Sequence, residues 1–396
     1  MQAATLDKLD QTDDLEWADR SEFWREYSSS LEPRRPKRER RSTPLILSGF
    51  GVSLRIENGA LKIRNGFTHY PQQREEFRFF KGQLDVPERI IMLDGNGSLS
   101  FSVIEWLHEQ NVVLVRIGWD GKSTVVIGGS GSPTNGDKLK WQFDLEQNPR
   151  RRIEFGAGLI SKKLEASRNT LLANFPNSEI REKAISQIEK CRDRLGAGRL
   201  RTMDELLQIE GAGAYAYFSV WQGLEIRWKK GNEKRVPQSW LAYDRRSSIL
   251  SGKKFKNWRA SNPINAMLNY AYAVLEANTR IRVVSEGYDP RIGILHVGRT
   301  REKEDSFVFD MMEPLRPVVD GAILNFVRGQ TFSAKDFVLR SDGVCRLNPQ
   351  LARAVAVEAA AAAGNQSDWL NFETIVASLS PSSAGSPNKI RQLGLA

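Results

Sequence analysis

The chain has 396 residues, of which 40% are hydrophobic, including 18 Phe and 10 Trp. This composition excludes an intrinsically disordered protein and predicts one large or two medium domains with a buried core. The 58 Lys and Arg residues exceed the 48 Asp and Glu residues, so the formal net charge is +10. That balance favours nucleic acid or an acidic membrane as a partner, although basic proteins with neither partner share it.

Cysteine content and hydrophobicity indicate the compartment. The two cysteines, Cys191 and Cys345, exclude a disulfide framework and a four-cysteine zinc or iron–sulfur site within this chain. The N-terminal sequence MQAATLDKLDQTDDLEW is polar and acidic, unlike a signal peptide. No apolar run approaches the ~20 residues that span a bilayer. We therefore expect a soluble protein of the reducing cytoplasm.

Residues 1–43 carry many charges without the spacing of a buried face. They end in a basic block between prolines, PRRPKRERR at 33–41. Such blocks are solvated linkers or, less often, arms that bind nucleic acid. We therefore expect residues 1–43 to form a basic-ended N-terminal extension.

Strand patterns begin at Pro44. VSLRIENGALKIR alternates apolar and polar residues on both sides of Asn58-Gly59, the pair that suits a type I′ turn, and so predicts a hairpin. The apolar run at 90–93 predicts a buried strand, SLSFSVIEWLHEQ predicts a helix, and NVVLVRIGWDGKSTVVIGG predicts two more strands. A small β-rich domain is expected at 44–140.

After residue 145 the apolar residues recur at spacings of three and four, which predicts amphipathic helices. Thr202 with Glu205 forms a capping box that opens one long helix, and Asn262-Pro263 opens another. The predicted fold is therefore α+β with two domains, the second a larger all-α domain at 145–345. Residues 346–396 are expected to be a variable C-terminal tail.

One helical pattern is interrupted by two prolines. In SFVFDMMEPLRPVVDGAILNFVRG, Pro314 and Pro317 follow closely on apolar residues with helical spacing. Proline inside a helix removes a hydrogen bond and clashes with the preceding turn. The pattern therefore predicts a kink or two abutting helical segments.

A scarce histidine stands near two acids in GILHVGRTREKEDSFVFDMMEPLRP. His296 is one of three histidines in the chain, and Asp310 and Glu313 are three residues apart, so the two acids share a helix face. Two carboxylates with an imidazole suit Mg²⁺ or Mn²⁺. An acid pair on a solvated helix and a histidine in the core would give the same pattern, so both interpretations stay open here.

Glu210 adds a third acid in an unusual setting. It lies within the apolar helix pattern LLQIEGAGAYAYF, where a carboxylate is costly unless it is paired or bound to a metal ion. A polar stripe on that helix, or pairing with a buried arginine, are the alternative explanations. Gly211 and Gly213 would let another backbone or a ligand come close.

Four ordered blocks resemble one known family. They are IEGAGAYAYF around Glu210, SNPINAMLNYAYAVL at 261–275, DPRIGILHVGR at 289–299 and SFVFDMMEPLRPVVD at 306–320. Together they look like the CRISPR-associated integrases of spacer acquisition, the Cas1 family, over roughly residues 44–345. The N-terminal extension and the C-terminal tail lie outside this resemblance.

The resemblance implies a catalytic site and its metal ion. Glu210, His296 and Glu313 match the family's metal ligands, and Asp310 matches an accompanying acid. Mg²⁺ or Mn²⁺ is the implied cofactor. The implied reaction is direct transesterification, in which the 3′-OH of a short DNA attacks a phosphodiester of a CRISPR repeat, with hydrolytic endonuclease activity beside it.

Several further residues take their roles from the same comparison. Arg316 and Asp320 match a segment whose role is structural, and Asn265 matches a polar residue near the site. Because the implied reaction needs no protein nucleophile, Tyr215 and Tyr217 are expected to be packing residues.

Basic clusters in the same half of the chain predict contacts with DNA phosphates. Arginines 150–152 form one cluster. The sequence KKFKNWR at 253–259, which contains Trp258, forms a second, and the segment after His296, which contains Lys303, forms a third. The DNA-binding residues that we predict are Lys253, Lys254, Lys256, Arg259, Arg299 and Arg301. Solvated surface charge is the alternative for each cluster.

The implied partners are double-stranded DNA and other protein chains. The family forms homodimers through its β domains, and two dimers commonly flank a smaller companion protein. Two alternatives remain: a transposon-encoded integrase of the same fold, and a non-catalytic DNA-binding scaffold in which the acids balance the basic surface.

Overall fold

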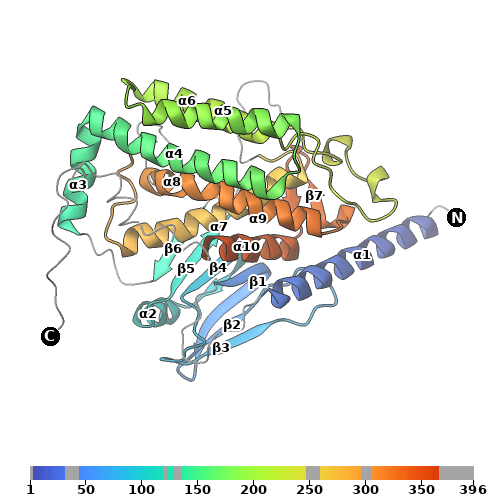
Figure 1. Cartoon of the computed structure of the whole chain (residues 1–396). Coiled ribbons are helices and arrows are strands. Elements are labelled where there is room, and N and C mark those ends of the chain that lie inside the picture. Colours follow the sequence, from blue (N-terminus) through green and yellow to red (C-terminus); the bar gives the residue numbers. More distant parts are fainter. Residues whose placement is uncertain are drawn as a thin grey trace.

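The structure is a computed structural model that describes residues 3–31, 44–118, 123–128, 135–246, 259–295 and 305–364. In this part of the chain, a β-sheet from the N-terminal half lies against a larger layer of helices (Figure 1). The expected order of a β-rich part followed by a helical part is confirmed. None of the described helices combines the length and the hydrophobicity needed to cross a membrane.

Six strands form one mixed sheet in the order β3-β2-β1-β4-β5-β6. The strands are β1 Leu45–Glu57, β2 Ala60–Arg64, β3 Glu76–Phe79, β4 Arg89–Leu99, β5 Val113–Ile117 and β6 Ser123–Gly128. The predicted β1–β2 hairpin turns at Asn58 and Gly59, which have positive φ angles of 52° and 77°. β4 pairs in parallel with β1 and with β5, and the predicted helix, α2 Phe101–Glu109, makes the crossover to β5.

Side chains of the central strands are buried on both faces of the sheet. In β1, Leu45 and Leu47 share a cluster with Trp106 of α2, whereas Ile46 belongs to the same core as the helices. Successive residues of a strand point to opposite faces, so the alternation fills both sides. One face is therefore covered by α2 and the other by the helical layer.

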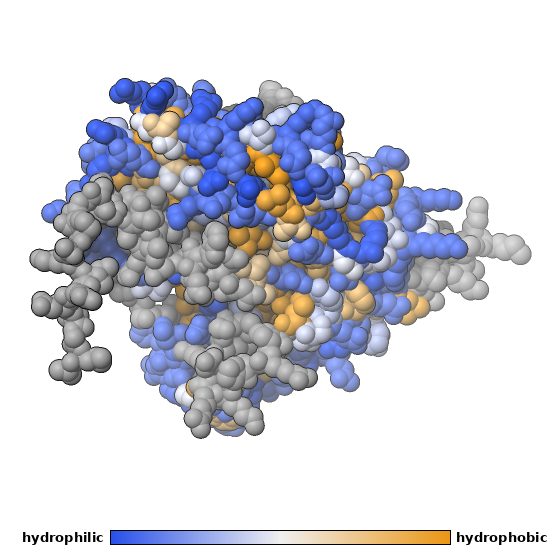
Figure 2. Space-filling view, in the orientation of Figure 1, coloured by the Kyte–Doolittle hydropathy of each residue, from blue (hydrophilic) through white to orange (hydrophobic). Residues whose placement is uncertain are grey.

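The helical layer follows the sheet in sequence. Its helices are α3 Gly136–Gln147, α4 Pro149–Asn174, α5 Glu179–Gly196, α6 Met203–Ser219, α7 Pro263–Ser285, α8 Ser306–Met312, α9 Arg316–Gly329 and α10 Pro349–Gly364. The predicted caps are present: Thr202 and Glu205 form a capping box on α6, and the Asn262 side chain caps α7. The surface seen in Figure 2 is mostly hydrophilic over this layer, as expected for helices that bury one face.

The two prolines divide one helical pattern, as predicted. α8 ends at Met312, a 3-10 turn, η3 Glu313–Leu315, follows, and α9 begins at Arg316. Pro314 and Pro317 each stand in the first turn of the segment that they open, where the missing N–H costs little. The break leaves Glu313 at the junction of the two segments.

The helical part is not all-α, which corrects the expectation for residues 145–345. β7 Phe337–Leu339 and β8 Cys345–Leu347 form a two-stranded antiparallel sheet. Each strand has three residues, too few for an alternating pattern to be recognised in the sequence.

The N-terminal segment differs from the expected extension, because residues Ala3–Ser30 form helix α1. Trp24 of α1 is fully buried, with its ring centroid 5.5 Å from that of Phe326 and 5.7 Å from that of Phe332. Among the side chains described on α1, from Asp14 onward, the buried ones include the polar Arg20, Ser21 and Ser28, so the sequence lacks a recognisable apolar face. α1 is nevertheless part of the core.

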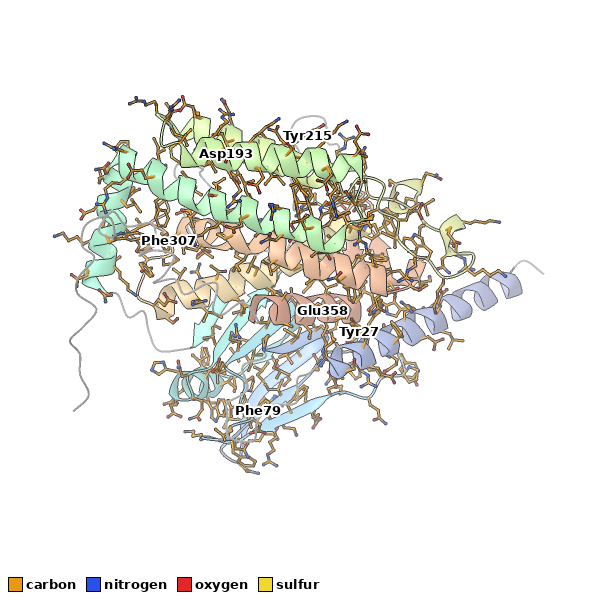
Figure 3. The ribbon with its side chains drawn as sticks, viewed as in Figure 1. Tyr27, Phe79, Asp193, Tyr215, Phe307 and Glu358 are labelled. Carbon is orange, nitrogen blue, oxygen red and sulfur yellow. The ribbon has the colours of Figure 1, made fainter. Side chains whose placement is uncertain are left out.

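Polar contacts also hold α1 in place. Arg20 forms a buried ion pair with Asp336 at 2.7 Å, and the Tyr27 hydroxyl donates to Glu358 of α10 at 2.6 Å (Figure 3). The Trp17 indole donates to the backbone carbonyl of Thr68, beside the sheet. α1 therefore contacts both the helical layer and the β-rich part.

The C-terminal boundary differs from the expectation as well. Residues from 346 were expected to form a variable tail, but Leu351 and Val355 of α10 are fully buried and belong to the core. Residues 365–396 and the basic block at 33–41 lie outside the described residues.

Candidate active site

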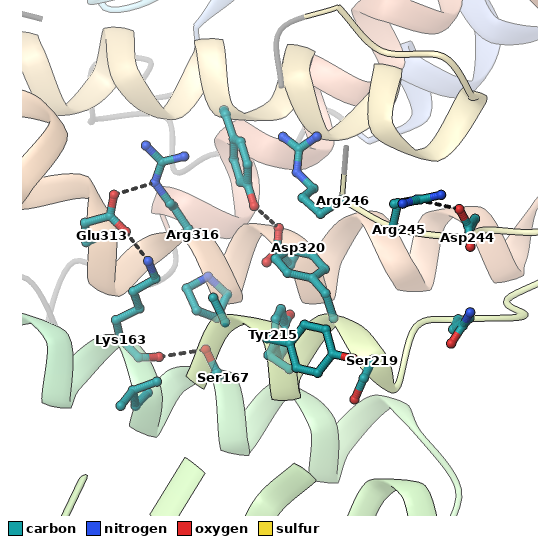
Figure 4. A pocket seen from close by; sticks show the side chains of 17 residues that line it. Lys163, Ser167, Tyr215, Ser219, Asp244, Arg245, Arg246, Glu313, Arg316 and Asp320 are labelled. Carbon is teal, nitrogen blue, oxygen red and sulfur yellow. Dashed lines mark hydrogen bonds and ion pairs between the residues drawn. The ribbon is translucent and has the colours of Figure 1, made fainter. Parts of the chain in front are cut away.

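Two of the four predicted catalytic residues converge on one point. Glu210 projects from α6 and Glu313 from η3, and their carboxylates lie 2.5 Å and 2.6 Å from the Nζ atom of Lys163 on α4. Glu313 also forms an ion pair with the Nε atom of Arg316 at 3.0 Å (Figure 4). Two carboxylates that are far apart in the sequence therefore share one positive centre.

A glycine explains how the two helices come close enough. A Cβ atom on Gly213 would lie 2.4 Å from Cδ2 of Leu164, so only a glycine allows this contact without a shift. Leu164 follows Lys163 on α4, and Gly213 lies one turn after Glu210 on α6. The close approach of α6 to α4 thus brings Glu210 to Lys163. Gly211 has no such contact within 4 Å.

The lysine is held in its charged form. Burial alone would lower the pKa of Lys163, because the ammonium ion loses water, but the carboxylates of Glu313 and Glu210 outweigh this and raise the pKa. The side chains of Lys163 and Glu313 are 15% and 5% exposed. Lys163 is therefore a partly buried ammonium ion bound by two carboxylates.

These carboxylates fit a divalent metal ion. Carboxylate oxygens are preferred ligands of Mg²⁺ and Mn²⁺, and the two already converge on a single cation. The third predicted ligand, His296, lies outside the described residues. Within the described ranges, no group of three His, Cys, Asp or Glu side chains has metal-binding geometry. The ligand set Glu210, Glu313 and His296 stays a prediction.

Asp310, the fourth predicted residue, has structural contacts. Its side chain is fully buried, and its Oδ2 atom accepts from the backbone N–H of Ile294 at 2.5 Å and of Leu295 at 3.1 Å. These bonds fix the backbone that leads directly to His296. Asp310 therefore holds the backbone of Ile294 and Leu295, the two residues that precede His296 in the sequence.

A pocket of about 810 Å³ opens beside the carboxylates. Lys163, Glu313 and Arg316 line one end of it, and Arg245 lies toward the other (Figure 4). Arginine is suited to binding phosphate through two parallel hydrogen bonds. The pocket can therefore hold a phosphate-bearing ligand next to Glu313.

Side chains of α7 position the arginines of the pocket. Arg246 donates to the Oδ1 atoms of Asn265 at 3.1 Å and of Asn269 at 2.9 Å, while the Asn265 amide donates to the carbonyl of Arg245 at 2.9 Å. Asn265 is fully buried. Its place in the structure agrees with the predicted location near the site.

Asp320 lines the pocket and belongs to a polar cluster. The Tyr272 hydroxyl donates to its Oδ1 atom at 2.5 Å, and Arg316 and Arg246 lie 4.9 Å and 5.3 Å from the centroid of the Tyr272 ring. Burial raises the pKa of Asp320 to about 6, although hydrogen bonds from tyrosine and the nearby arginines oppose the increase.

This pKa predicts how stability depends on pH. Folded Asp320 binds a proton more tightly than the unfolded chain, whose carboxyl titrates near 3.8, so its favourable contribution is complete below pH 3.8 and is lost as pH rises through 6. Asp320→Asn should therefore gain about 2 kcal/mol relative to wild type between pH 4 and pH 8. Urea unfolding at several pH values measures this difference, with exposed Asp193→Asn as the control. A difference that does not change with pH would contradict the prediction.

Most of the predicted DNA-binding residues lie outside the residues that the structure describes. Arg259 is described and is partly buried. The predicted residues outside the described ranges are Lys253, Lys254, Lys256, Arg299 and Arg301, together with the neighbouring Trp258 and Lys303. In the N-terminal cluster of α4, Arg150 pairs with Glu154, whereas Arg152 donates to the carbonyl of Ile294 at 2.6 Å.

The two tyrosines of α6 differ from each other. Tyr217 is buried, as expected of a packing residue. Tyr215 is 80% exposed and lines the pocket, so the expectation that it packs in the core is wrong. Tyr215 stands between Ala214 and the buried Ala216 in a run of small and aromatic residues, and composition alone does not distinguish it from Tyr217.

Sequence reasoning missed Lys163, Arg245, Arg246 and Tyr272. Lys163 follows another lysine in an amphipathic helix, which is typical of a solvated face. Arg245 and Arg246 precede the predicted DNA-binding cluster at 253–259 by a few residues, and this proximity was the only signal in the sequence that they belong to the site. Tyr272 stands in the block SNPINAMLNYAYAVL, where aromatic residues are expected in the core.

The family model described as CRISPR associated protein Cas1 matches residues 45–360, and the chain belongs to this family. A relative from Methanospirillum hungatei, named CRISPR-associated endonuclease Cas1 1, is 30% identical over 202 residues, which cover 50% of this chain and 53% of the relative. This match thus spans about half of that relative. A relative of the same name from Archaeoglobus fulgidus is 26% identical over 324 residues, covering 78% of this chain and 85% of the relative.

Two solved structures share the fold. A casposase bound to integration product has a TM-score of 0.63 at 23% identity and covers 81% of this chain and 82% of its own. A Cas1 protein from Thermotoga maritima has a TM-score of 0.61 at 15% identity, covering 84% and 97%. At these identities the likeness establishes the fold and not the reaction.

Proposed function

We propose that this chain is an integrase of CRISPR adaptation that joins the 3′-OH ends of short foreign DNA to a CRISPR repeat and also cleaves phosphodiester bonds. The observation that carries this proposal is the convergence of Glu210 and Glu313 on one partly buried cation beside an arginine-lined pocket. Membership of the Cas1 family supports it, as do the curated relatives that are named endonucleases.

In the proposed reaction, the 3′-oxygen of the incoming strand bonds to a phosphorus atom of the repeat, and the bond from that phosphorus to its own 3′-oxygen breaks. The attacking hydroxyl loses its proton to solvent, and the departing oxygen takes one up. Glu210, Glu313 and His296 would hold Mg²⁺ or Mn²⁺, which would supply Lewis-acid chemistry at the phosphate. Arg316 and Arg246 would bind phosphate and align the strand.

The proposed partners follow from the family. Double-stranded DNA is both the incoming fragment and the target. We propose two domains, with the β-rich residues 44–140 forming a homodimer interface and residues 145–345 carrying catalysis, and two dimers flanking a smaller companion protein. A solved Cas6-RT-Cas1–Cas2 complex with a TM-score of 0.58 supports such a companion.

A transposon-encoded integrase is the second candidate. The likeness to a casposase, at a TM-score of 0.63, favours it. The two candidates differ in their DNA: a CRISPR integrase targets a repeat, whereas a transposon integrase inserts the terminal repeats of its own element. Competition between these two substrates in one joining reaction would distinguish them.

Strand joining tests the proposal. The purified protein is incubated with a labelled duplex bearing 3′-OH ends, a supercoiled plasmid that carries a CRISPR repeat, and Mg²⁺ or Mn²⁺. We expect label to join the plasmid only with metal, and to be lost in Glu210→Ala and His296→Ala. If no label is joined even with the companion protein, the proposed function is wrong and a DNA-binding scaffold remains. If both variants join label as well as wild type, the assignment of Glu210 and His296 to the site is wrong.

A further inference from the structure

Lys163 has a place in the site that the proposed reaction does not yet use. Its ammonium group contacts both candidate metal ligands, Glu210 at 2.5 Å and Glu313 at 2.6 Å. Arg316 adds a second positive charge at 3.0 Å from Glu313. The two carboxylates and these two cations together are electrically neutral. The site is therefore fully balanced by side chains of the chain itself.

A divalent ion and Lys163 would compete for the same oxygens. Mg²⁺ binds carboxylate oxygens at about 2.0–2.1 Å, closer than the ammonium contacts, so both cations cannot occupy the space between the two groups. Repulsion between a dication and an ammonium ion is strong where little water screens it. Lys163 is 15% exposed, so water screens this position weakly.

The pocket offers Lys163 another position. Lys163 lines the pocket of about 810 Å³ together with Ser167 and Arg316. Its ammonium group is carried on a flexible stem of four carbon atoms. By rotation, the ammonium group can turn from the carboxylates toward the space where a phosphate would lie. Leaving the carboxylates would therefore not leave the charge unsolvated.

We propose that Lys163 is an internal counter-ion that a divalent metal ion displaces from Glu210 and Glu313, and that the displaced ammonium group then binds a DNA phosphate in the pocket. The inference rests on the proposed function, because it takes the two glutamates as metal ligands. In this arrangement Lys163 is a positioning residue that sets the affinity for metal and couples metal binding to phosphate binding.

Direct Mn²⁺ binding tests the first half. Isothermal titration calorimetry without DNA compares wild type with Lys163→Met, which keeps the length of the side chain and removes its charge, and with Lys162→Met as the matched control. We expect Lys163→Met to bind Mn²⁺ roughly tenfold more tightly or better, because one competing cation is gone. Lys162→Met should equal wild type. Equal or weaker binding by folded Lys163→Met would overturn the inference.

Lysine labelling of the wild-type protein needs no variant and so does not depend on folding of Lys163→Met. Acetylation by an N-hydroxysuccinimide ester is followed by mass spectrometry, with Lys162 as the internal reference. We expect weak labelling of Lys163 in buffer, stronger labelling with Mg²⁺, and weak labelling again when a short DNA duplex is added with Mg²⁺. Labelling that Mg²⁺ leaves unchanged would overturn the displacement, and labelling that DNA leaves strong would overturn the phosphate contact.

Failure of the proposed function gives a different result. If wild type binds no Mn²⁺, or if Glu313→Gln does not weaken the binding, the metal site itself is wrong and the inference is wrong with it. If Mn²⁺ binds, Glu313→Gln weakens it and joining occurs, but Lys163 responds in neither experiment, the proposed function stands and only the role of Lys163 is wrong.

Discussion

Glu313→Gln is expected to lower the rate of strand joining by more than about 100-fold, beyond the loss that follows removal of an outer-shell partner of a metal ligand. Glutamine keeps the shape of the side chain but cannot supply a negative charge to Mg²⁺ or Mn²⁺. It also leaves the Lys163 ammonium with Glu210 as its one remaining carboxylate contact among those described here. Initial rates of label transfer to the plasmid, measured at saturating metal, give the effect.

Glu179→Gln is the matched control for this change. Glu179 is exposed at the start of α5 and pairs with Lys183 in solvent, so the same substitution should leave joining unchanged. Circular dichroism and thermal unfolding of both variants establish that they are folded. Joining by folded Glu313→Gln at the rate of wild type would remove Glu313 from the catalytic site.

The second large effect concerns α1. Asp336→Ala should destabilise the protein by about 3–5 kcal/mol, because it leaves the buried Arg20 guanidinium without its carboxylate. Asp336 is fully buried and accepts hydrogen bonds from Arg20, from the indole of Trp24 and from the backbone of Ser333, all at 2.7–2.8 Å. The free energy of unfolding from urea titration measures the loss.

An exposed aspartate provides the comparison. Asp144→Ala on α3 removes a carboxyl that folding leaves in water, and its effect should stay within about 0.5 kcal/mol. If Asp336→Ala costs no more than Asp144→Ala, α1 is not docked through this ion pair. Because Asp336 lies on η4, Ala334–Asp336, and does not line the pocket, the folded variant should still join strands.

Local signals predicted much of the fold. The turn at Asn58-Gly59 and the capping box at Thr202 depend on residues a few positions apart, and such signals act in the same way wherever the segment packs. The strand order β3-β2-β1-β4-β5-β6 depends on pairings between distant segments, which no short pattern encodes. α1 was missed for a related reason, since Trp24 is recognisable as a core residue only once Phe326 and Phe332 are beside it.

The site was predicted unevenly. Glu210 stood out because a carboxylate is costly within an apolar helix, and the resemblance linked it to Glu313; the structure brings the two together. Lys163 gave no signal, because its burial results from the approach of α6 to α4 at Gly213. The hydrogen bonds from the backbone of Ile294 and Leu295 to Asp310 join distant segments, so helix spacing did not predict them, and the catalytic role of Asp310 stays a prediction.

The junction at η3 has a consequence for any attempt to divide the protein. Glu313 is contributed by a three-residue turn held between α8 and α9, while Lys163 and Glu210 come from α4 and α6. The two candidate metal ligands, Glu210 and Glu313, come from α6 and from this junction, so no short peptide would contain both. Affinity for Mn²⁺ would thus report whether α6 and the junction of α8 with α9 are in register, and proteolysis that separates them should abolish it before most of the helical content is lost.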